Sequence, residues 1–403
     1  MNHHDPIPLE AYEKRSQQPR AKAVRLTAAP YVWRDPASIP PRQWLYGNHY
    51  IRSYVTATVA PGGLGKTSVV QTEALAMATG RNLLGVEPSC DLLRVWLWNL
   101  EDPVEEVERR FAAAVLQHGV NPGEFKDKIF LNSGRDTRLV IASKVKDSIT
   151  IAEPVIDALV AEIQAKEIDV LIIDPFVSSH GLPENDNAAV DAAVKAWGRV
   201  AGKTNCSIEL VHHSRKLNGD QISADSARGG SAFVDGCRAV RVINRMTEDE
   251  AAKFGLDEHR RYIFMMPDKQ NMAPPVDKRD WFQMVSVPLP NGDNVAAVES
   301  WTPPNPFDDV TVQHLEQAQN EFDLGNYRES DQSPEWGGFV VARLLDINAG
   351  DGLKGKECSS AQKKARAKVR SILRTWQMNG AIALETRLDT NRHERKFYVS
   401  VRD

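Results

Sequence analysis

The sequence predicts an α/β fold, in which helices cover a mainly parallel sheet, followed by a small C-terminal domain. From about residue 50 to residue 300, short apolar runs alternate with amphipathic stretches, and residues 170–173 are apolar throughout. Strands of a parallel sheet are buried on both faces and therefore read as continuous apolar runs. A proline-rich acidic stretch that begins near Pro303 separates this region from a basic C-terminal segment.

The expected elements follow in order along the chain. The predicted strands are residues 53–59, 93–100, 169–173, 207–211, 239–243, 262–266 and 281–287. The predicted helices of the same region are residues 68–79, 103–118, 156–165 and 188–201. In the C-terminal segment we expect a short helix at 339–347, a long basic helix at 360–379, and a hairpin of strands 381–385 and 396–401 around residues 389–392. Two helices followed by a hairpin are typical of a winged helix-turn-helix domain.

These patterns predict four segments. Residues 1–30 are polar and without a lasting period, so we expect a flexible N-terminal arm. Residues 31–300 form the core, residues 301–335 are expected to be a linker because prolines and acids dominate them, and residues 336–403 form the winged-helix domain.

Composition excludes several classes of protein. The chain of 403 residues is 42% hydrophobic and 26% charged, as in an ordinary globular protein. Its four cysteines are scattered without a C-x-x-C pair, which excludes a disulfide scaffold and fits a reducing cytoplasm. No apolar run approaches the roughly 18 residues that a membrane span needs, and the start carries no apolar signal segment. We therefore expect a cytoplasmic protein without membrane contact.

The net charge of −4 hides an asymmetry. Residues 337–403 hold 14 Lys and Arg against 7 Asp and Glu, a balance of +7, whereas the remainder has a balance of −11. A basic end on an acidic body indicates contact with nucleic acid, although a solvated helix face gives the same count.

A glycine-rich turn between a predicted strand and a predicted helix is the strongest motif. It matches the P-loop pattern except for the alanine at its first position. Glycines let backbone N–H groups surround phosphates, and the helix that follows directs its positive end toward them. The lysine reaches the outer phosphates and the next hydroxyl binds Mg²⁺, so the sequence predicts ATP and Mg²⁺ as ligands. The predicted binding residues are Ala60, Pro61, Gly62, Gly63, Leu64, Gly65, Lys66, Thr67 and Ser68.

Acids and histidines at the ends of other predicted strands extend this site. Asp174 ends the apolar run 170–173, and a carboxylate there points into the crevice where ligands bind, so it is the expected second Mg²⁺ ligand. Glu101 ends strand 93–100 and is the expected catalytic base if that strand neighbours the P-loop strand, with Asp102 as its competitor. His213, in preference to His212, is placed to contact the γ-phosphate.

The motifs together resemble the RepA-type hexameric replicative helicases of plasmids and phages, a branch of the RecA-like P-loop ATPases. The resemblance covers roughly residues 40–285. It rests on VAPGGLGKT at 59–67, WNLEDP at 98–103, LIIDPFVSSHGLPENDN at 171–187, LVHHSRK at 210–216, ARGGSAFVDGCRAVRVINR at 227–245 and DKQNMAPP at 268–275.

The resemblance implies a RecA-like P-loop NTPase core that forms homo-hexamers, hydrolyses ATP between subunits and translocates on single-stranded DNA. It implies Lys66 and Thr67 as phosphate and Mg²⁺ residues, Glu101 as base, Asp174 as Walker B acid, and His213 as γ-phosphate sensor. The arginine finger falls at Arg238 by one family pattern and at Arg245 by another. Loops 176–190 and 215–228 would face the pore, where Arg215, Lys216 and Arg228 supply positive charge and Glu184 and Asp186 oppose it.

The winged helix departs from the minimal family pattern. Its basic residues would meet phosphates, whereas Leu373 and Trp376 are expected to be core. A protein partner for this domain is the other interpretation, and a DNA-binding regulatory or partner-recruiting ATPase is the alternative function. The basic residues concerned are Lys363, Lys364, Arg366, Lys368, Arg370 and Arg374 on the helix, and Arg392 and Arg395 at the wing.

Overall fold

The computed structural model describes residues 27–88, 92–145, 148–214, 221–227, 230–274, 278–388 and 392–402. Contacts divide the chain into two units, Met1–Arg42 and Gln43–Asp403. Most of the predicted N-terminal arm lies outside the described residues. The described part of the first unit contains a short 3-10 helix, Pro36–Ser38, which begins where the Asp35 side chain accepts a hydrogen bond from the Ala37 amide.

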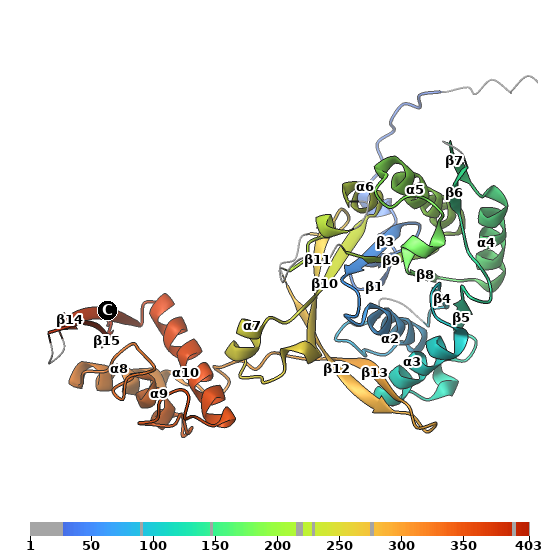
Figure 1. The fold of residues 1–403 in the computed structure, drawn as a ribbon. Coiled ribbons are helices and arrows are strands. Elements are labelled where there is room, and N and C mark those ends of the chain that lie inside the picture. Colours follow the sequence, from blue (N-terminus) through green and yellow to red (C-terminus); the bar gives the residue numbers. More distant parts are fainter. Residues whose placement is uncertain are drawn as a thin grey trace, which may run out of the picture. The chain divides into compact units, whose positions relative to one another are not determined.

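One large sheet organises the second unit (Figure 1). Among the described residues it has nine strands in the order β13-β12-β11-β10-β3-β9-β8-β4-β5. The six strands from β10 to β5 run parallel to one another, and β11, β12 and β13 extend the sheet antiparallel beyond β10. The bounds are β3 Val55–Ala60, β4 Val95–Asn99, β5 Ile129–Ser133, β8 Val170–Asp174, β9 Ser207–His213, β10 Ala239–Arg245, β11 Tyr262–Gln270, β12 Asp280–Pro288 and β13 Asn294–Ser300.

Helices cover both faces of the parallel part of this sheet (Figure 1). Helices α2 (Lys66–Thr79) and α3 (Val104–Gln117) pack with strand residues into one apolar cluster on one face. Helices α4 (Glu153–Lys166), α5 (Asn187–Thr204) and α6 (Gly230–Gly236) pack into a second cluster on the other face. The predicted fold class, an α/β fold with a mainly parallel sheet, is confirmed.

The predicted strands and helices of the core are present, but several elements were not predicted. Strands β5 and β13 mix apolar and polar residues without a clean period, so no pattern marked them. The same holds for the short α7 (Glu248–Lys253) and for the two small hairpins, β1 (Trp44–Tyr46) with β2 (Tyr50–Ile51) and β6 (Ala142–Val145) with β7 (Ser148–Ile151). These elements depend on pairing with distant strands or on local turns, which sequence periodicity does not report.

The predicted linker 301–335 is wrong over Val312–Leu324, which form helix α8. Thr311 caps this helix by accepting a hydrogen bond from the His314 amide, and the buried Ala318 and Phe322 belong to the apolar cluster of the C-terminal segment. That cluster also includes residues of α9 (Gly338–Leu344), α10 (Ser360–Met378), β14 (Ile382–Leu388) and β15 (Glu394–Ser400). The proline and acid content therefore predicted an irregular linker at the place where α8, the first helix of the C-terminal segment, lies.

A cluster of buried charges lies beneath α2. The Arg241 guanidinium on β10 donates to both carboxylate oxygens of Glu73 on α2, and its Nε donates to Thr58 on β3 at 2.8 Å. The Tyr50 hydroxyl donates to Glu73 at 2.7 Å. Glu209 on β9 accepts from Thr56 and Thr58. Each of these charged groups is nearly inaccessible, so each must be paired to be tolerated there.

His49 joins the same cluster as a neutral ring. Its Nε2 lies 2.9 Å from a carboxylate oxygen of Glu209, and burial together with the charge of Arg241 lowers its pKa. The pKa of Glu209 is also lowered, because the hydrogen bonds from His49 and Thr56 and the charge of Arg241 outweigh the cost of its burial. The contact is therefore a hydrogen bond from a neutral imidazole to a carboxylate.

We expect this pair to make the fold less stable in acid. Below about pH 6.5 the unfolded chain protonates His49 while the folded chain resists it, so the free energy of unfolding falls by up to about 1.4 kcal/mol per pH unit. The lowered pKa of Glu209 acts in the same direction below about pH 4.5. Urea unfolding at pH 5 to 7.5 should show His49→Gln losing less stability than wild type over pH 6.5 to 5. Equal pH slopes for the two proteins would contradict the neutral assignment.

Candidate nucleotide-binding site

The predicted phosphate-binding turn links the end of β3 to the start of α2. Ala60 is the last residue of β3, Lys66 is the first residue of α2, and Gly65 between them has φ +80°. A Cβ atom at Gly65 would lie 2.9 Å from Cε of Met284 on β12, the flexible end of a side chain that can move, so it is the backbone conformation that requires glycine here. The turn therefore has the strand–turn–helix context that a P-loop needs.

Lys66 is held in the turn by acceptors. Its Nζ lies 3.2 Å from the Ala60 oxygen, 3.1 Å from the Pro61 oxygen and 3.1 Å from Nδ1 of His213. Burial lowers the pKa of Lys66 to about 8, although the carboxylates of Asp174 and Glu101 oppose that shift. Bound phosphates would replace these neutral acceptors with charged ones, which the ammonium prefers.

Thr67 and Asp174 meet as predicted. The Thr67 hydroxyl donates to Oδ2 of Asp174 at 2.6 Å, and Asp174 ends β8 in a nearly inaccessible position. Burial raises the pKa of Asp174, while Thr67 and Lys66 act to lower it. A hydroxyl and a buried carboxylate are oxygen donors of the kind that Mg²⁺ takes alongside substrate phosphates. The residues present therefore fit Mg²⁺, which Thr67 and Asp174 would hold.

Glu101 reaches the site by a different route from the one expected. Strand β4 does not neighbour β3, because β9 and β8 lie between them. Instead Asn99 of β4 pairs with Asp174 of β8, and the Leu100 amide donates a hydrogen bond to the backbone carbonyl oxygen of Asp174 at 2.7 Å. Glu101 lies two residues beyond Asn99 on this turn, and its charge raises the pKa of both Lys66 and Asp174. Adjacency to the Asp174 strand, and not to the P-loop strand, brings Glu101 to the site.

The competing acid is engaged elsewhere. Asp102 accepts a hydrogen bond from Arg110 of α3 at 2.7 Å. The exposed Glu101 carboxylate has no hydrogen bond or ion pair to any residue that the structure describes. The side-chain oxygen of Asn99 accepts hydrogen bonds from the backbone amides of Glu101 and Asp102, at 3.0 and 2.7 Å. These two bonds fix the turn that carries both acids. The geometry thus favours Glu101 over Asp102.

The two histidines at the end of β9 have different surroundings. His212 is buried and its ring packs on Phe176 and Phe233, with centroids 5.4 and 4.5 Å away. His213 is partly exposed and contacts Lys66. The structure therefore favours His213 as the residue that faces a phosphate.

Among the residues that the structure describes, neither Arg238 nor Arg245 forms a hydrogen bond or ion pair with a residue of the P-loop. Arg238 lies before β10, where its guanidinium sits 5.7 Å from the centroid of the Tyr54 ring. Arg245 is exposed at the carboxyl end of β10, the end at which the parallel strand β3 leads into the P-loop. The assignment of a finger to either residue stays a prediction.

The predicted pore loops are described only in part. Residues 215–220 and 228–229, with Arg215, Lys216 and Arg228, lie outside the described residues. In the first loop Asp186 caps α5, accepting from the amides of Ala188 and Ala189. This acid has a local structural role, which accounts for its presence in a segment predicted to face DNA.

Several residues of the site were not predicted. Asn99 and Arg110 position the two acids, Arg135 donates to the Glu101 backbone oxygen at 2.8 Å, and Met284 lies against Gly65. Asn99, two residues before Glu101, was the one local signal available. The other contacts join segments far apart in the sequence.

Comparisons with known proteins agree with the P-loop reading. Residues 20–219 match the family model described as an AAA domain, a range that contains the P-loop, Glu101, Asp174 and His213. Among solved structures, the chain is similar to the RadB recombinase, with 12% identity and a TM-score of 0.38 over 59% of this chain and 89% of that one. It is also similar to a KaiC-like protein of the hyperthermophilic archaeon Pyrococcus horikoshii OT3, with 13% identity and a TM-score of 0.41 over 64% and 94%. Both likenesses are too remote to bear on activity.

The match to an AAA domain and the strand–turn–helix geometry together support a P-loop ATPase domain on an α/β sheet. In the part of the chain that the structure describes, no helix is long and apolar enough to cross a membrane.

We predict that the Thr67 hydroxyl is needed for Mg²⁺-dependent nucleotide binding. Thr67→Val keeps the volume but removes the oxygen, and should weaken Mg-ATP binding by about ten-fold, the effect expected when one good hydrogen-bonding or metal contact is lost. Thr67→Ser keeps the oxygen and should bind nearly as wild type. Calorimetric titration with Mg²⁺ and with EDTA checks this, and equal affinities for the two variants would refute the role.

Proposed function

We propose that the protein is a RepA-like ATP-dependent DNA helicase or translocase, which hydrolyses ATP at subunit interfaces and acts on single-stranded DNA in replication of a plasmid, phage or other mobile element. The observation that carries the ATPase part is the convergence of Lys66, Thr67, Asp174, Glu101 and His213 at the carboxyl edge of one parallel sheet. A site that only held nucleotide would need the first three of these residues. In the proposal the last two serve hydrolysis.

Each of these side chains has a chemical role in the proposal. Lys66 neutralises the outer phosphates, while Thr67 and Asp174 hold Mg²⁺, which supplies positive charge to the phosphate oxygens. Glu101, the exposed carboxylate beside Asp174, orients the attacking water and accepts its proton. His213 contacts the γ-phosphate. Because His213 also contacts Lys66, a change in the bound phosphates would be felt at the end of β9.

The proposal includes a homo-hexamer, as the resemblance to ring helicases implies. In a ring, Arg238 or Arg245 of one subunit would stabilise the transition-state charge at the neighbour's site. The DNA part rests on the resemblance of the motifs and on the basic C-terminal segment, which we interpret as a winged helix. The proposed location is the cytoplasm.

A regulatory or partner-recruiting ATPase remains the second candidate. It is favoured by the paired state of the C-terminal basic helix, where Lys364, Lys368 and Arg370 already form ion pairs within the chain. Such a protein would hydrolyse ATP without responding to single strands.

We expect single-stranded DNA to stimulate ATP hydrolysis by wild type, and Lys66→Ala to abolish hydrolysis with and without DNA. The lysine supplies charge to the outer phosphates that no other described residue in the turn supplies. Phosphate release measured with and without an oligonucleotide checks both expectations. Hydrolysis that is indifferent to the oligonucleotide would reject the translocase and favour the second candidate.

We also expect Glu101→Gln to lower kcat by about 100-fold or more while leaving nucleotide affinity near wild type, as for loss of a general base. Asp102→Asn is the matched control, since it changes the adjacent acid and breaks only the pair with Arg110. Single-turnover hydrolysis and nucleotide binding are measured for both. A larger loss of kcat in the control would transfer the role to Asp102.

A further inference from the structure

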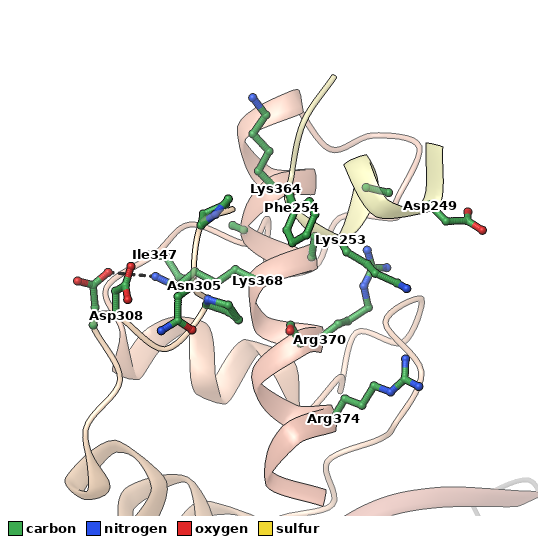
Figure 2. A pocket seen from close by; sticks show the side chains of 17 residues that line it. Asp249, Lys253, Phe254, Asn305, Asp308, Ile347, Lys364, Lys368, Arg370 and Arg374 are labelled. Carbon is green, nitrogen blue, oxygen red and sulfur yellow. Dashed lines mark hydrogen bonds and ion pairs between the residues drawn. The ribbon is translucent and has the colours of Figure 1, made fainter. Parts of the chain in front are cut away.

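A groove runs along one side of α10 and is separate from the nucleotide site (Figure 2). It has a volume of about 910 Å³. We call it the α10 groove; its walls come from α7 with Phe254 and from residues 304–309, and its floor is α10.

The floor of the α10 groove is basic. Lys364, Lys368, Arg370 and Arg374 all line it on the side of α10 that faces the groove (Figure 2). Lys364 and Lys368 are four residues apart, as are Arg370 and Arg374, so the members of each pair are neighbours on successive turns. The opposite side of α10 holds Val369, Ile372, Leu373 and Trp376, which are buried in the C-terminal apolar cluster, as predicted for the last two. Lys253 at the end of α7 adds a fifth positive charge to the lining.

One predicted DNA-contacting residue is not available. Arg366 is buried, and it donates to the backbone oxygens of Ala349, Gly350, Leu353 and Asp331. The prediction that Arg366 meets phosphates is therefore wrong, because this guanidinium holds the loop before α10 in place.

Carboxylates of the same chain engage part of the basic floor. Nζ of Lys364 lies 3.3 Å from Asp257, and Nζ of Lys368 lies 3.0 Å from Asp309. Asp257 and Asp309 are largely exposed, with 67% and 79% of their side chains accessible, so these pairs open at little cost. Lys253 and Arg374 form no hydrogen bond or ion pair with any described residue.

The shape of the groove selects the kind of polyanion. A duplex is read by a helix that lies free in a major groove about 12 Å wide. Here α7 on one side and Pro304, Pro306 and Asp309 on the other stand over the basic side of α10. A single strand needs only a charged channel with an apolar or aromatic wall, and Phe254 with the two prolines provides that wall.

We propose that the α10 groove binds the backbone of single-stranded nucleic acid, whose phosphates displace Asp257 and Asp309 from Lys364 and Lys368. The inference rests on the proposed function for the choice of nucleic acid as the polyanion. It adds a binding site for single-stranded nucleic acid outside the predicted ring pore. It also identifies Asp257 and Asp309 as carboxylates of the same chain that compete with phosphates for that site.

The test measures binding of a fluorescent 20-nucleotide oligo-dT to the full chain by anisotropy between 50 and 400 mM salt. The double variant Lys253→Ala/Arg374→Ala breaks no ion pair and should keep the fold, which thermal melting verifies. Losing two phosphate contacts should lower the salt slope by about 1.4, which corresponds to roughly 25-fold in affinity at 0.1 M salt. Lys363→Ala, an exposed charge on α10 that does not line the groove, should stay near wild type.

The internal carboxylates give an opposite expectation. Asp309→Asn frees Lys368 and should tighten oligo-dT binding by up to about five-fold, the limit for an exposed ion pair. A hairpin duplex of the same length should bind more weakly than oligo-dT to the wild type.

An unchanged salt slope in the double variant, or stronger binding of the duplex, would overturn the inference. ATP hydrolysis by the same proteins separates this outcome from failure of the proposed function. Strand-stimulated hydrolysis that survives without groove binding rejects the α10 groove alone. Groove binding without stimulation rejects the translocase alone.

Discussion

The ion pair between Arg241 and Glu73 is the contact on which the geometry of the nucleotide site most depends. It joins β10 to α2 in the protein interior, and through Thr58 it reaches the strand that leads into the phosphate-binding turn. A buried pair of this kind adds little net stability compared with apolar packing, but losing one partner leaves a charge buried without compensation. Its effect here is to fix where α2 begins, and therefore where Lys66 and Thr67 point.

The order of strands determines the rest of the site. Because β9 lies between β3 and β8, His213 stands next to the P-loop, while Asp174 faces Thr67 across one strand. Because β4 follows β8, the turn after Asn99 delivers Glu101 to the far side of Asp174. Three strand ends thus bring three candidate residues to one edge, which is the property of parallel sheets that makes them frequent ligand sites.

In the C-terminal segment, the number of basic residues differs from the number that are left to bind a partner. The segment's excess of basic residues predicted a row of phosphate contacts. Arg366, however, donates its hydrogen bonds to backbone carbonyls, and Lys364, Lys368 and Arg370 form ion pairs with acids. Charge that is exposed and unpaired, as at Lys253 and Arg374, lies on two different elements. The electrostatic surface is therefore a property of how the helices pack as well as of composition.

The fold class, the P-loop, the positions of Asp174 and His213 at strand ends, and the burial of Leu373 and Trp376 could all be predicted from the sequence, because they depend on apolar periodicity and on residue types at local spacing. Three features could be found only in the folded chain: the strand before Glu101 pairs with the Asp174 strand and not with the P-loop strand, Asp102 pairs with Arg110, and α8 interrupts the predicted linker. The same holds for which basic residues of α10 form ion pairs or hydrogen bonds within the chain. Strand order, ion pairing and burial join residues far apart along the chain, and a local pattern contains no information about those partners.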